Sequence, residues 1–238
     1  MLDHIRVDQI LFIDIETVPE VYSFDDLSDR GQSLWAKKMK WQMDRDSLSA
    51  KESYEKAGIF AEFAKVVCIS AAFYYKPDKE LRIKSFYDID EKKLLQCFSE
   101  MLARFFEDDD QYLCAHNGKE FDFPFLARRY LINELELPYC LDLAGKKPWE
   151  VQHLDTMNLW KFGDYKHYTS LDLLTHAFNI PSPKSTIDGS DVARLFYEEK
   201  NYEAIKNYCE DDVIAMSRLL MKWKGQPSVE DKKIIRIT

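Results

Sequence analysis

The sequence predicts an α/β domain in which helices flank a mixed central sheet. Apolar segments of strand length dominate its first half, and segments with helical periodicity dominate its second half. A helical segment joins an early group of strands to a further strand, which is the order expected for a layered α/β domain. Because the 238 residues contain no internal repeat, low-complexity segment or Gly/Ser-rich linker, we expect one domain over residues 1–238.

The first strand is expected at residues 9–15, which are apolar almost throughout and therefore buried on both faces. Helical spacing follows at residues 30–64, where large apolar residues recur at every fourth position from Trp35. Between the first two strands we therefore place a helical insertion at about residues 25–64.

A pair of strands, a helix and a further strand come next. Segments with strand composition at residues 66–75 and 81–87 flank a Lys-Pro-Asp-Lys turn. Residues 91–107 carry their apolar side chains along one helical face. A short strand at residues 111–115 precedes a loop and a helix that opens near Pro124, because proline is favoured in a first helical turn.

The second half is predicted to be mainly helical. Residues 151–159 are expected to be extended at their start. Three helices follow, at about residues 169–178, 191–200 and 202–224. The residues from about 225–238 are expected to form a charged C-terminal tail.

The chain is acidic, with 33 Lys and Arg against 42 Asp and Glu and a net charge of −9. Nucleic-acid binders usually carry a basic surface. The acidic charge therefore argues against a nucleic-acid binder. This argument weakens if clustered acids hold cations and only a single-strand end enters a narrow site.

No apolar stretch approaches the ~20 residues of a membrane helix, so no membrane partner is expected. Five cysteines without a Cys-x-x-Cys pair, and an N-terminus without a secretory apolar core, indicate a cytoplasmic protein with reduced thiols and no structural zinc.

The first strand carries two acids. Because side chains alternate along a strand, Phe12, Asp14 and Glu16 share one face. Carboxylates in an apolar element repel each other and are costly unless a positive charge meets them. Together with the acids at residues 117–124 and 208–212, this pattern favours a pair of divalent cations and metal-dependent phosphodiester cleavage. The alternative is a strand that has ended, with Glu16 in solvent before Pro19.

The last predicted helix also carries an acid within its apolar stripe. Asp212 falls where the periodicity favours leucine, and Tyr208 lies one turn earlier on the same side. A carboxylate at such a position must be hydrogen-bonded, paired or bound to metal, so the alternative is a satisfied core aspartate. Glu210 and Asp211 fall outside the stripe and are expected in solvent. The stripe comprises Ile205, Cys209, Met216, Leu219, Leu220 and Trp223.

A third candidate acid, Asp122, directly precedes a predicted helix. A helix N-cap is the simpler interpretation of an aspartate at this position. Its place just beyond the end of a strand also suits a ligand site, because ligands of open α/β sheets gather at strand ends.

In combination the three motifs are specific. A strand Asp-x-Glu at residues 12–17, an Asn-x-x-x-Phe-Asp-x-Pro segment at residues 117–124 and a helical Tyr-x-x-x-Asp at residues 208–212 occur in this order. This pattern resembles the DEDD superfamily of exonucleases, in the version whose third motif carries tyrosine. The middle motif is similar to that of the proofreading exonuclease domain of family B DNA polymerases. The resemblance runs from residue 11 to about residue 220, implies a ribonuclease H-like fold and suggests a stand-alone relative.

The resemblance implies a role for each motif residue. Asp14, Glu16 and Asp212 would bind one metal ion, Asp14 would bridge to a second, and Asp122 would hold that second ion through water. Two Mg²⁺ or Mn²⁺ ions suit such oxygen ligands. Tyr208 would orient the attacking water, and nucleoside 5′-monophosphates would leave from a 3′ end.

Further residues are expected to contact the substrate. Glu16 would accept a hydrogen bond from the terminal 3′-hydroxyl, and Thr17 completes the first motif. Asn117 and Phe121 would contact the last nucleotides by amide hydrogen bonding and by stacking, although a core aromatic is an equal alternative for Phe121. Lys184 would meet a phosphate, against the alternative of an ordinary exposed lysine.

Three other features have simpler interpretations. Residues 35–41, with lysines between two tryptophans, would grip single-stranded backbone or, more simply, form an amphipathic packing helix. His116 and His153 are expected to be structural.

The expected function is a 3′–5′ exonuclease acting on single-stranded DNA or unpaired 3′ ends. An exoribonuclease that trims RNA is the alternative within the same chemistry, because the sequence does not show how a 2′-hydroxyl is treated. A module that binds nucleic acid or a protein without cutting, and a phosphohydrolase of small nucleotides, are the alternatives from other classes.

Overall fold

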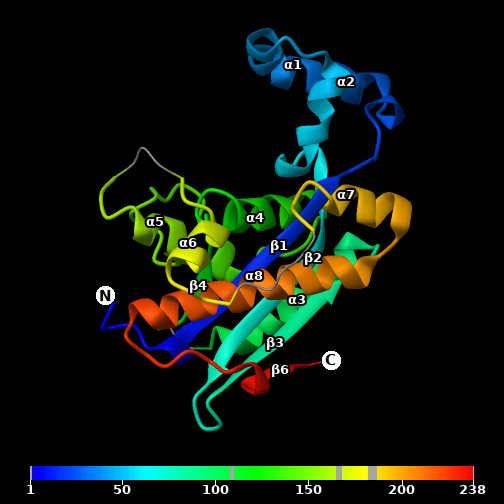
Figure 1. Ribbon diagram of the computed structural model, residues 1–238. Coiled ribbons are helices and arrows are strands. Elements are labelled where there is room, and N and C mark those ends of the chain that lie inside the picture. Colours follow the sequence, from blue (N-terminus) through cyan, green and yellow to red (C-terminus); the bar gives the residue numbers. More distant parts are fainter. Residues whose placement is uncertain (1, 108–109, 165–167, 182–186, 238) are drawn as a thin grey trace.

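A computed structural model describes residues 2–107, 110–164, 168–181 and 187–237. Its centre is a six-stranded sheet in the order β5-β4-β1-β2-β3-β6 (Figure 1). The strands are β1 Ile10–Pro19, β2 Ala64–Tyr75, β3 Glu80–Tyr87, β4 Tyr112–Ala115, β5 Leu154–Asp155 and β6 Ile234–Arg236. The β1–β2 and β2–β3 pairs are antiparallel, whereas β1–β4, β4–β5 and β3–β6 are parallel. The predicted mixed sheet is therefore confirmed.

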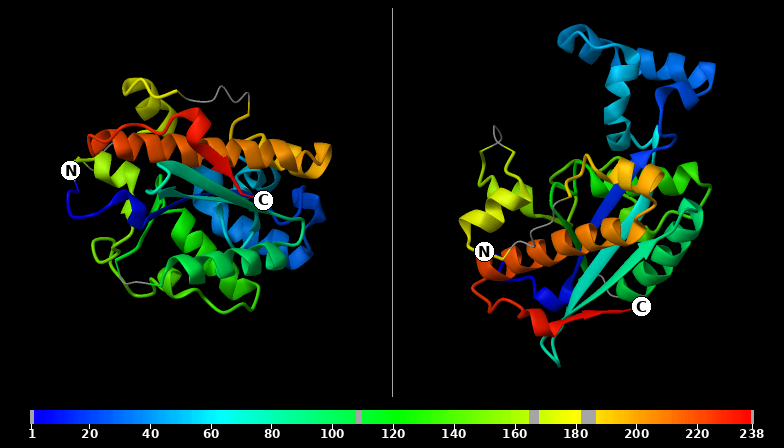
Figure 2. Two further views of the ribbon diagram at one scale, coloured as in Figure 1. Left: turned by 90° about the horizontal axis from the view of Figure 1, so that it is seen from below. Right: turned by 45° about the vertical axis from the view of Figure 1, so that its right-hand side comes forward.

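Helices cover both faces of this sheet, as predicted. The α-helices are α1 Asp29–Asp46, α2 Ala50–Ser53, α3 Glu91–Phe105, α4 Asp122–Ile132, α5 Thr156–Trp160, α6 Leu171–Ala177, α7 Val192–Arg194 and α8 Tyr202–Trp223. The long α8 crosses one face, and α3 and α4 lie on the other (Figure 2). Polar caps start these helices: the Asn201 side chain accepts from the Ala204 N–H at the start of α8, and Asp90 accepts from Lys92 and Lys93 at the start of α3.

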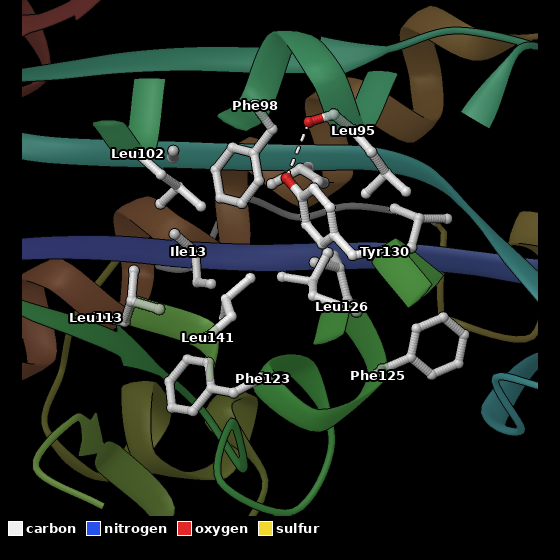
Figure 3. Packing of buried hydrophobic residues seen from close by; sticks show 14 of the residues in the cluster. Ile13, Leu95, Phe98, Leu102, Leu113, Phe123, Phe125, Leu126, Tyr130 and Leu141 are labelled. Atoms are coloured by element: carbon white, nitrogen blue, oxygen red, sulfur yellow. Dashed lines mark hydrogen bonds between the residues drawn. The ribbon is translucent and has the colours of Figure 1, made fainter. Parts of the chain in front are cut away.

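The alternation of β1 divides the core between the two faces. Leu11, Ile13 and Ile15 pack with α3 and α4, whereas Ile10 and Phe12 pack with α8. Figure 3 shows the first of these clusters, in which the Tyr130 hydroxyl donates to the Leu95 carbonyl at 2.9 Å. Asp14 and Glu16 follow Phe12 at even spacing, and one carboxylate oxygen of each lies within 4.8 Å of the Cys209 sulfur of α8, so both acids lie on this face. The expected common face is confirmed.

The predicted helical insertion is a separate lobe that stands away from the sheet (Figure 1). It comprises α1, α2 and a 3₁₀ segment at Tyr54–Ile59. Its small core is built around Trp35, which is fully buried and donates its indole N–H to the Ala50 carbonyl at 3.0 Å. Residues 35–41 therefore form the expected packing helix, although Trp41 is 71% exposed.

Two segments differ from their expected form. The helix expected at residues 191–200 is only a short α7, followed by a π-helical turn at Leu195–Glu199. The expected charged tail also contributes β6, which pairs in parallel with Leu81–Ile83 of β3. Within the described ranges, no helix has the length and apolar character that crossing a membrane requires.

Candidate active site

Two carboxylates lie side by side where β1 passes under α8. Asp14 and Glu16 extend from the same face of β1, and a register shift between Glu16 and Thr17 marks a bulge directly after them. Bulges often occur beside active sites, where they re-aim a side chain. One carboxylate oxygen of each acid and the Cys209 sulfur lie within 4.8 Å of one another.

Burial and mutual repulsion disfavour the charge on both acids. Burial raises the pKa of Asp14 well above its ordinary value, and the carboxylates of Glu16, Asp212 and Asp122 raise it further. Burial likewise raises the pKa of Glu16 well above its ordinary value, as do Cys68, Asp212 and Asp122. Glu16 is 7% exposed, and no hydrogen bond joins its carboxylate to any described residue. The alternative interpretation, in which Glu16 is solvated at a strand end, is therefore wrong.

Asp122 approaches β1 from the first turn of α4. It is the first residue of this helix rather than its cap, because Phe121 occupies the cap position. The backbone N–H groups of Asp122 itself and of Ile15 favour its charged form, but burial outweighs them and raises the pKa of Asp122 to about 8. Since Ile15 lies between Asp14 and Glu16, the structure brings Asp122 to the same part of the strand.

Asp212 and Tyr208 face this strand from α8. Burial raises the pKa of Asp212 to about 6, with further contributions from Asp211 and Asp172, although a hydrogen bond from Tyr208 opposes the shift. Burial and the charges of Asp212, Glu16 and Asp14 raise the pKa of the Tyr208 phenol. Most of the predicted apolar stripe of α8 is buried, but Trp223 and Asp212 are each only partly buried.

The four carboxylates have no cationic partner among the described residues. None of the ion pairs between described residues includes Asp14, Glu16, Asp122 or Asp212. Buried carboxylates without a cation are costly, and they relieve that cost by taking up protons or a metal ion. Their oxygen atoms are the ligands that Mg²⁺ and Mn²⁺ prefer, so the donor set fits a divalent cation.

Comparisons with known proteins show the family and the fold of the chain. Residues 59–224 match the family described as "Predicted 3'-5' exonuclease related to the exonuclease domain of PolB". The chain belongs to this family. The match contains Asp122, Tyr208 and Asp212, and it begins after the strand that carries Asp14 and Glu16.

The fold of this exonuclease-family protein is similar to a solved polymerase structure. That structure is the family B DNA polymerase from the hyperthermophilic archaeon Pyrobaculum calidifontis, with a TM-score of 0.56 and 15% sequence identity. The similarity covers 90% of this chain and 24% of the polymerase chain. At this identity it shows the fold, and the predicted ribonuclease H-like architecture is confirmed.

The residues that were expected to bind substrate in this exonuclease-family protein differ from one another in burial and in hydrogen-bond partners. The Thr17 hydroxyl donates to the Gly58 carbonyl at 2.7 Å, so it ties β1 to the base of the insertion. Asn117 is half-buried and has a left-handed φ of 67°. Phe121 packs against Phe125 with ring centroids 5.3 Å apart and contributes to the core, which favours the core alternative. Lys184 lies outside the described residues.

Asp155 is a site residue that sequence reasoning missed. It is 3% exposed, and its carboxylate accepts backbone N–H groups from Asn117 and Lys119 at 3.0 Å and from Asn158 at 3.1 Å. It thereby fixes the loop that leads from β4 to Asp122. The available signal was an aspartate at the end of an extended segment directly before a helix.

A glycine completes the same loop. A Cβ atom at Gly118 would lie 2.8 Å from the Phe123 ring and would also collide with Ala115. Only glycine fits this close approach. His116 is structural as expected, because its ring nitrogens contact the Thr156 hydroxyl at 2.8 Å and the Thr169 carbonyl at 2.9 Å.

His153 is likewise structural, and Glu210 requires a correction. His153 accepts from the Leu113 N–H at 3.2 Å and contacts the Cys140 carbonyl at 2.6 Å. Glu210, which was expected in solvent, is 2% exposed. The Ser85 hydroxyl donates to it at 2.8 Å and the Arg236 guanidinium at 2.7 Å, because β3 and β6 cover this side of α8.

Proposed function

We propose that this protein is a two-metal-dependent 3′–5′ exonuclease that releases nucleoside 5′-monophosphates from single-stranded DNA or unpaired 3′ ends. The observation that carries the proposal is that Asp122 of α4 and Asp212 of α8 lie close enough to Asp14 and Glu16 of β1 to raise the pKa values of both, without a cationic partner among the described residues. Membership of a family of predicted 3′–5′ exonucleases supports the same chemistry.

Four acids would hold the ions. Asp14, Glu16 and Asp212 would bind one cation, and Asp14 would also reach a second that Asp122 holds through water. When bound, two Mg²⁺ or Mn²⁺ ions activate a water molecule and stabilise the departing 3′-oxygen. The raised pKa values of Asp14, Glu16 and Asp122 support this assignment, because cations would replace the protons that these acids otherwise retain.

Tyr208 would position the attacking water rather than deprotonate it. Its phenol donates a hydrogen bond to Asp212, and the surrounding acids raise its pKa above the ordinary value. A tyrosine in these surroundings keeps its proton at neutral pH. Its contribution is therefore orientation, and the carboxylate-held cations would supply the activation.

The substrate would enter as a single-strand end. Asp14, Tyr208 and Asp212 are only half-buried, so solvent reaches the acids from one side. Glu16 would accept the terminal 3′-hydroxyl, and the loop at Asn117 would contact the last nucleotide. A net charge of −9 fits a short strand end better than a long duplex. The five free thiols support the proposed cytoplasmic location.

The test uses the full chain and a single-stranded DNA carrying a label at its 5′ end, with Mg²⁺ or Mn²⁺. We expect a ladder that shortens from the 3′ end and a release of 5′-mononucleotides. Asp212→Asn should remove this activity. Asp211→Asn is the matched control, since it removes a half-buried carboxylate from the neighbouring position of the same helix.

Substrate comparisons decide the finer assignment. If RNA of the same sequence is cut faster than DNA, the protein is an exoribonuclease rather than a DNA exonuclease. Faster turnover of a mononucleotide ester than of any oligomer would indicate a small-nucleotide phosphohydrolase. Failure to release mononucleotides with either metal would falsify the proposal.

A further inference from the structure

Cys209 places a thiol against the carboxylates of the candidate active site. Its side chain is fully buried, and its sulfur donates weakly to the Asp14 backbone carbonyl at 3.4 Å. The thiol also hydrogen-bonds the Asp14 carboxylate, where it favours the charged form. The sulfur and one oxygen each of Asp14 and Glu16 all lie within 4.8 Å of one another.

We infer that Asp14, Glu16 and Cys209 form a binding site for a thiophilic divalent cation such as Zn²⁺ or Cd²⁺. An ion bound there takes two carboxylates away from the hard cations of the proposed reaction and so inhibits it. The site shares Asp14 and Glu16 with the proposed function, but the cation it selects and the use of Cys209 go beyond that proposal.

The donor set suits a soft or borderline ion. Zn²⁺ binds thiolate sulfur at about 2.3 Å and carboxylate oxygen at about 2.0–2.2 Å, usually with tetrahedral geometry. Tetrahedral ligands at these lengths lie roughly 3.3–3.8 Å apart, so no pair of ligand atoms within the 4.8 Å group needs to close by more than about 1.5 Å. Binding releases the Cys209 proton to water. Mg²⁺ prefers oxygen and gains nothing from the sulfur, so the thiol discriminates between the two kinds of ion.

The location of Glu16 supports this assignment independently of the thiol. Its carboxylate is 7% exposed and has no hydrogen-bond donor among the described residues. A nearly buried carboxylate without a donor gains more from a cation than a solvated one does. Glu16 therefore offers a ligand that the described residues leave without a hydrogen-bond donor, and Cys209, whose own contacts are weak sulfur hydrogen bonds, lies beside it.

Two other cysteines provide matched controls. Cys68 lies on β2 opposite Glu16 and hydrogen-bonds Cys209, but its sulfur is not part of the three-residue group. Cys97 is exposed on α3, on the other face of the sheet. Replacing either by serine removes a thiol without removing the inferred ligand.

The experiment titrates the metal-free full chain with Cd²⁺ and follows the ultraviolet charge-transfer absorption of a cadmium–thiolate bond. We expect one absorbing complex per chain in the wild type, in Cys68→Ser and in Cys97→Ser, and none in Cys209→Ala. Cys209→Ser is a second variant in case alanine disturbs packing, and circular dichroism reports whether each variant is folded. Asp14→Asn and Glu16→Gln should each weaken Cd²⁺ binding by about tenfold or more.

The outcomes separate this inference from the proposed function. Absorption that persists in folded Cys209→Ala, or that is unaffected by both carboxylate variants, would overturn the inference. A wild type that degrades DNA with Mg²⁺ but forms no cadmium–thiolate complex would overturn it too, while leaving the nuclease intact. A complex that needs Cys209 and both acids, in a protein without nuclease activity, supports the inference and removes the proposed function.

Discussion

The protein contains two clusters of buried acids, which differ in whether the protein itself compensates their negative charge. Glu91, at the start of α3, is 7% exposed and forms an ion pair with Arg129 at 2.5 Å. The Val66 N–H donates to it at 2.7 Å and the Asn133 amide at 2.8 Å. Arg129 in turn donates to the Ala61 carbonyl at 2.7 Å. Every charge in this cluster has a partner from the protein.

Among the described residues, the acids around Asp14 have no such partner. Their pKa values are raised by burial and by one another, whereas Glu91 is neutralised by a guanidinium. A buried charge that is paired within the protein links the elements that carry the two partners. A buried charge without a partner in the protein indicates a ligand-binding site. The two sites therefore predict opposite effects of mutation on stability and activity.

The largest effect is expected for Asp14→Asn on catalysis. Because Asp14 would contact both cations, its loss should lower kcat at least ~10³-fold, the size of effect seen when a central transition-state contact is removed. The metal-free protein should meanwhile unfold at an equal or higher temperature, since one of four repelling acids is neutralised. Single-turnover kinetics and thermal unfolding measure the two effects. Wild-type turnover in this variant would show that the roles are wrongly assigned.

Arg129→Met should produce the reverse result. Removing one partner of a buried ion pair costs about 3–5 kcal/mol, because Glu91 is left charged and uncompensated. Chemical denaturation should show this loss, and the activity per folded molecule should remain near that of wild type. The double change Arg129→Met with Glu91→Leu should recover part of the stability. A strong loss of activity in folded Arg129→Met would remove the distinction between the two sites.

Tyr208→Phe should have an intermediate effect. The substitution keeps the ring but removes the hydroxyl that hydrogen-bonds Asp212. We expect kcat to fall by about 10–1000-fold, the range for loss of general acid–base assistance, with little change in metal affinity. Calorimetry of Mn²⁺ binding tests the second half of this prediction, and a large loss of Mn²⁺ affinity would make Tyr208 a structural part of the metal site.

The smallest effect is expected for Asp155→Asn. The amide retains one acceptor oxygen but faces backbone N–H groups with its own N–H₂, so the loop at Asn117 should loosen. KM for a single strand should rise several-fold, by roughly the ~1 kcal/mol of a hydrogen bond, while kcat changes less. A fall in kcat with unchanged KM would instead indicate that Asp155 acts in the chemical step.

The sequence predicted those parts of the site that depend on local periodicity. Alternation along β1 placed Asp14 and Glu16 on one face, and helical spacing aligned Tyr208 with Asp212. The burial of Glu210 was not predicted, because the strands that cover it are distant from it in the sequence. Asp155 was missed for a similar reason, since its partners at Asn117 and Lys119 lie nearly forty residues earlier.

The direct test of the central claim is the pH dependence of stability between pH 7 and pH 8 without metal. The folded pKa of Asp122, about 8, lies above the ordinary value near 4, so the folded protein binds a proton that the unfolded chain releases. Stability should therefore fall as pH rises through this window. Ordinary histidines, with a pKa near 6.5, contribute little there.

Chemical denaturation of wild type and Asp122→Asn at both pH values, with and without Mg²⁺, makes the measurement. We predict that metal-free wild type loses stability from pH 7 to pH 8, that Mg²⁺ restores it most at pH 8, and that Asp122→Asn shows a smaller loss. If the free energy of unfolding depends equally on pH in the two proteins and Mg²⁺ stabilises neither, the claim that these acids form a cation-binding site is contradicted.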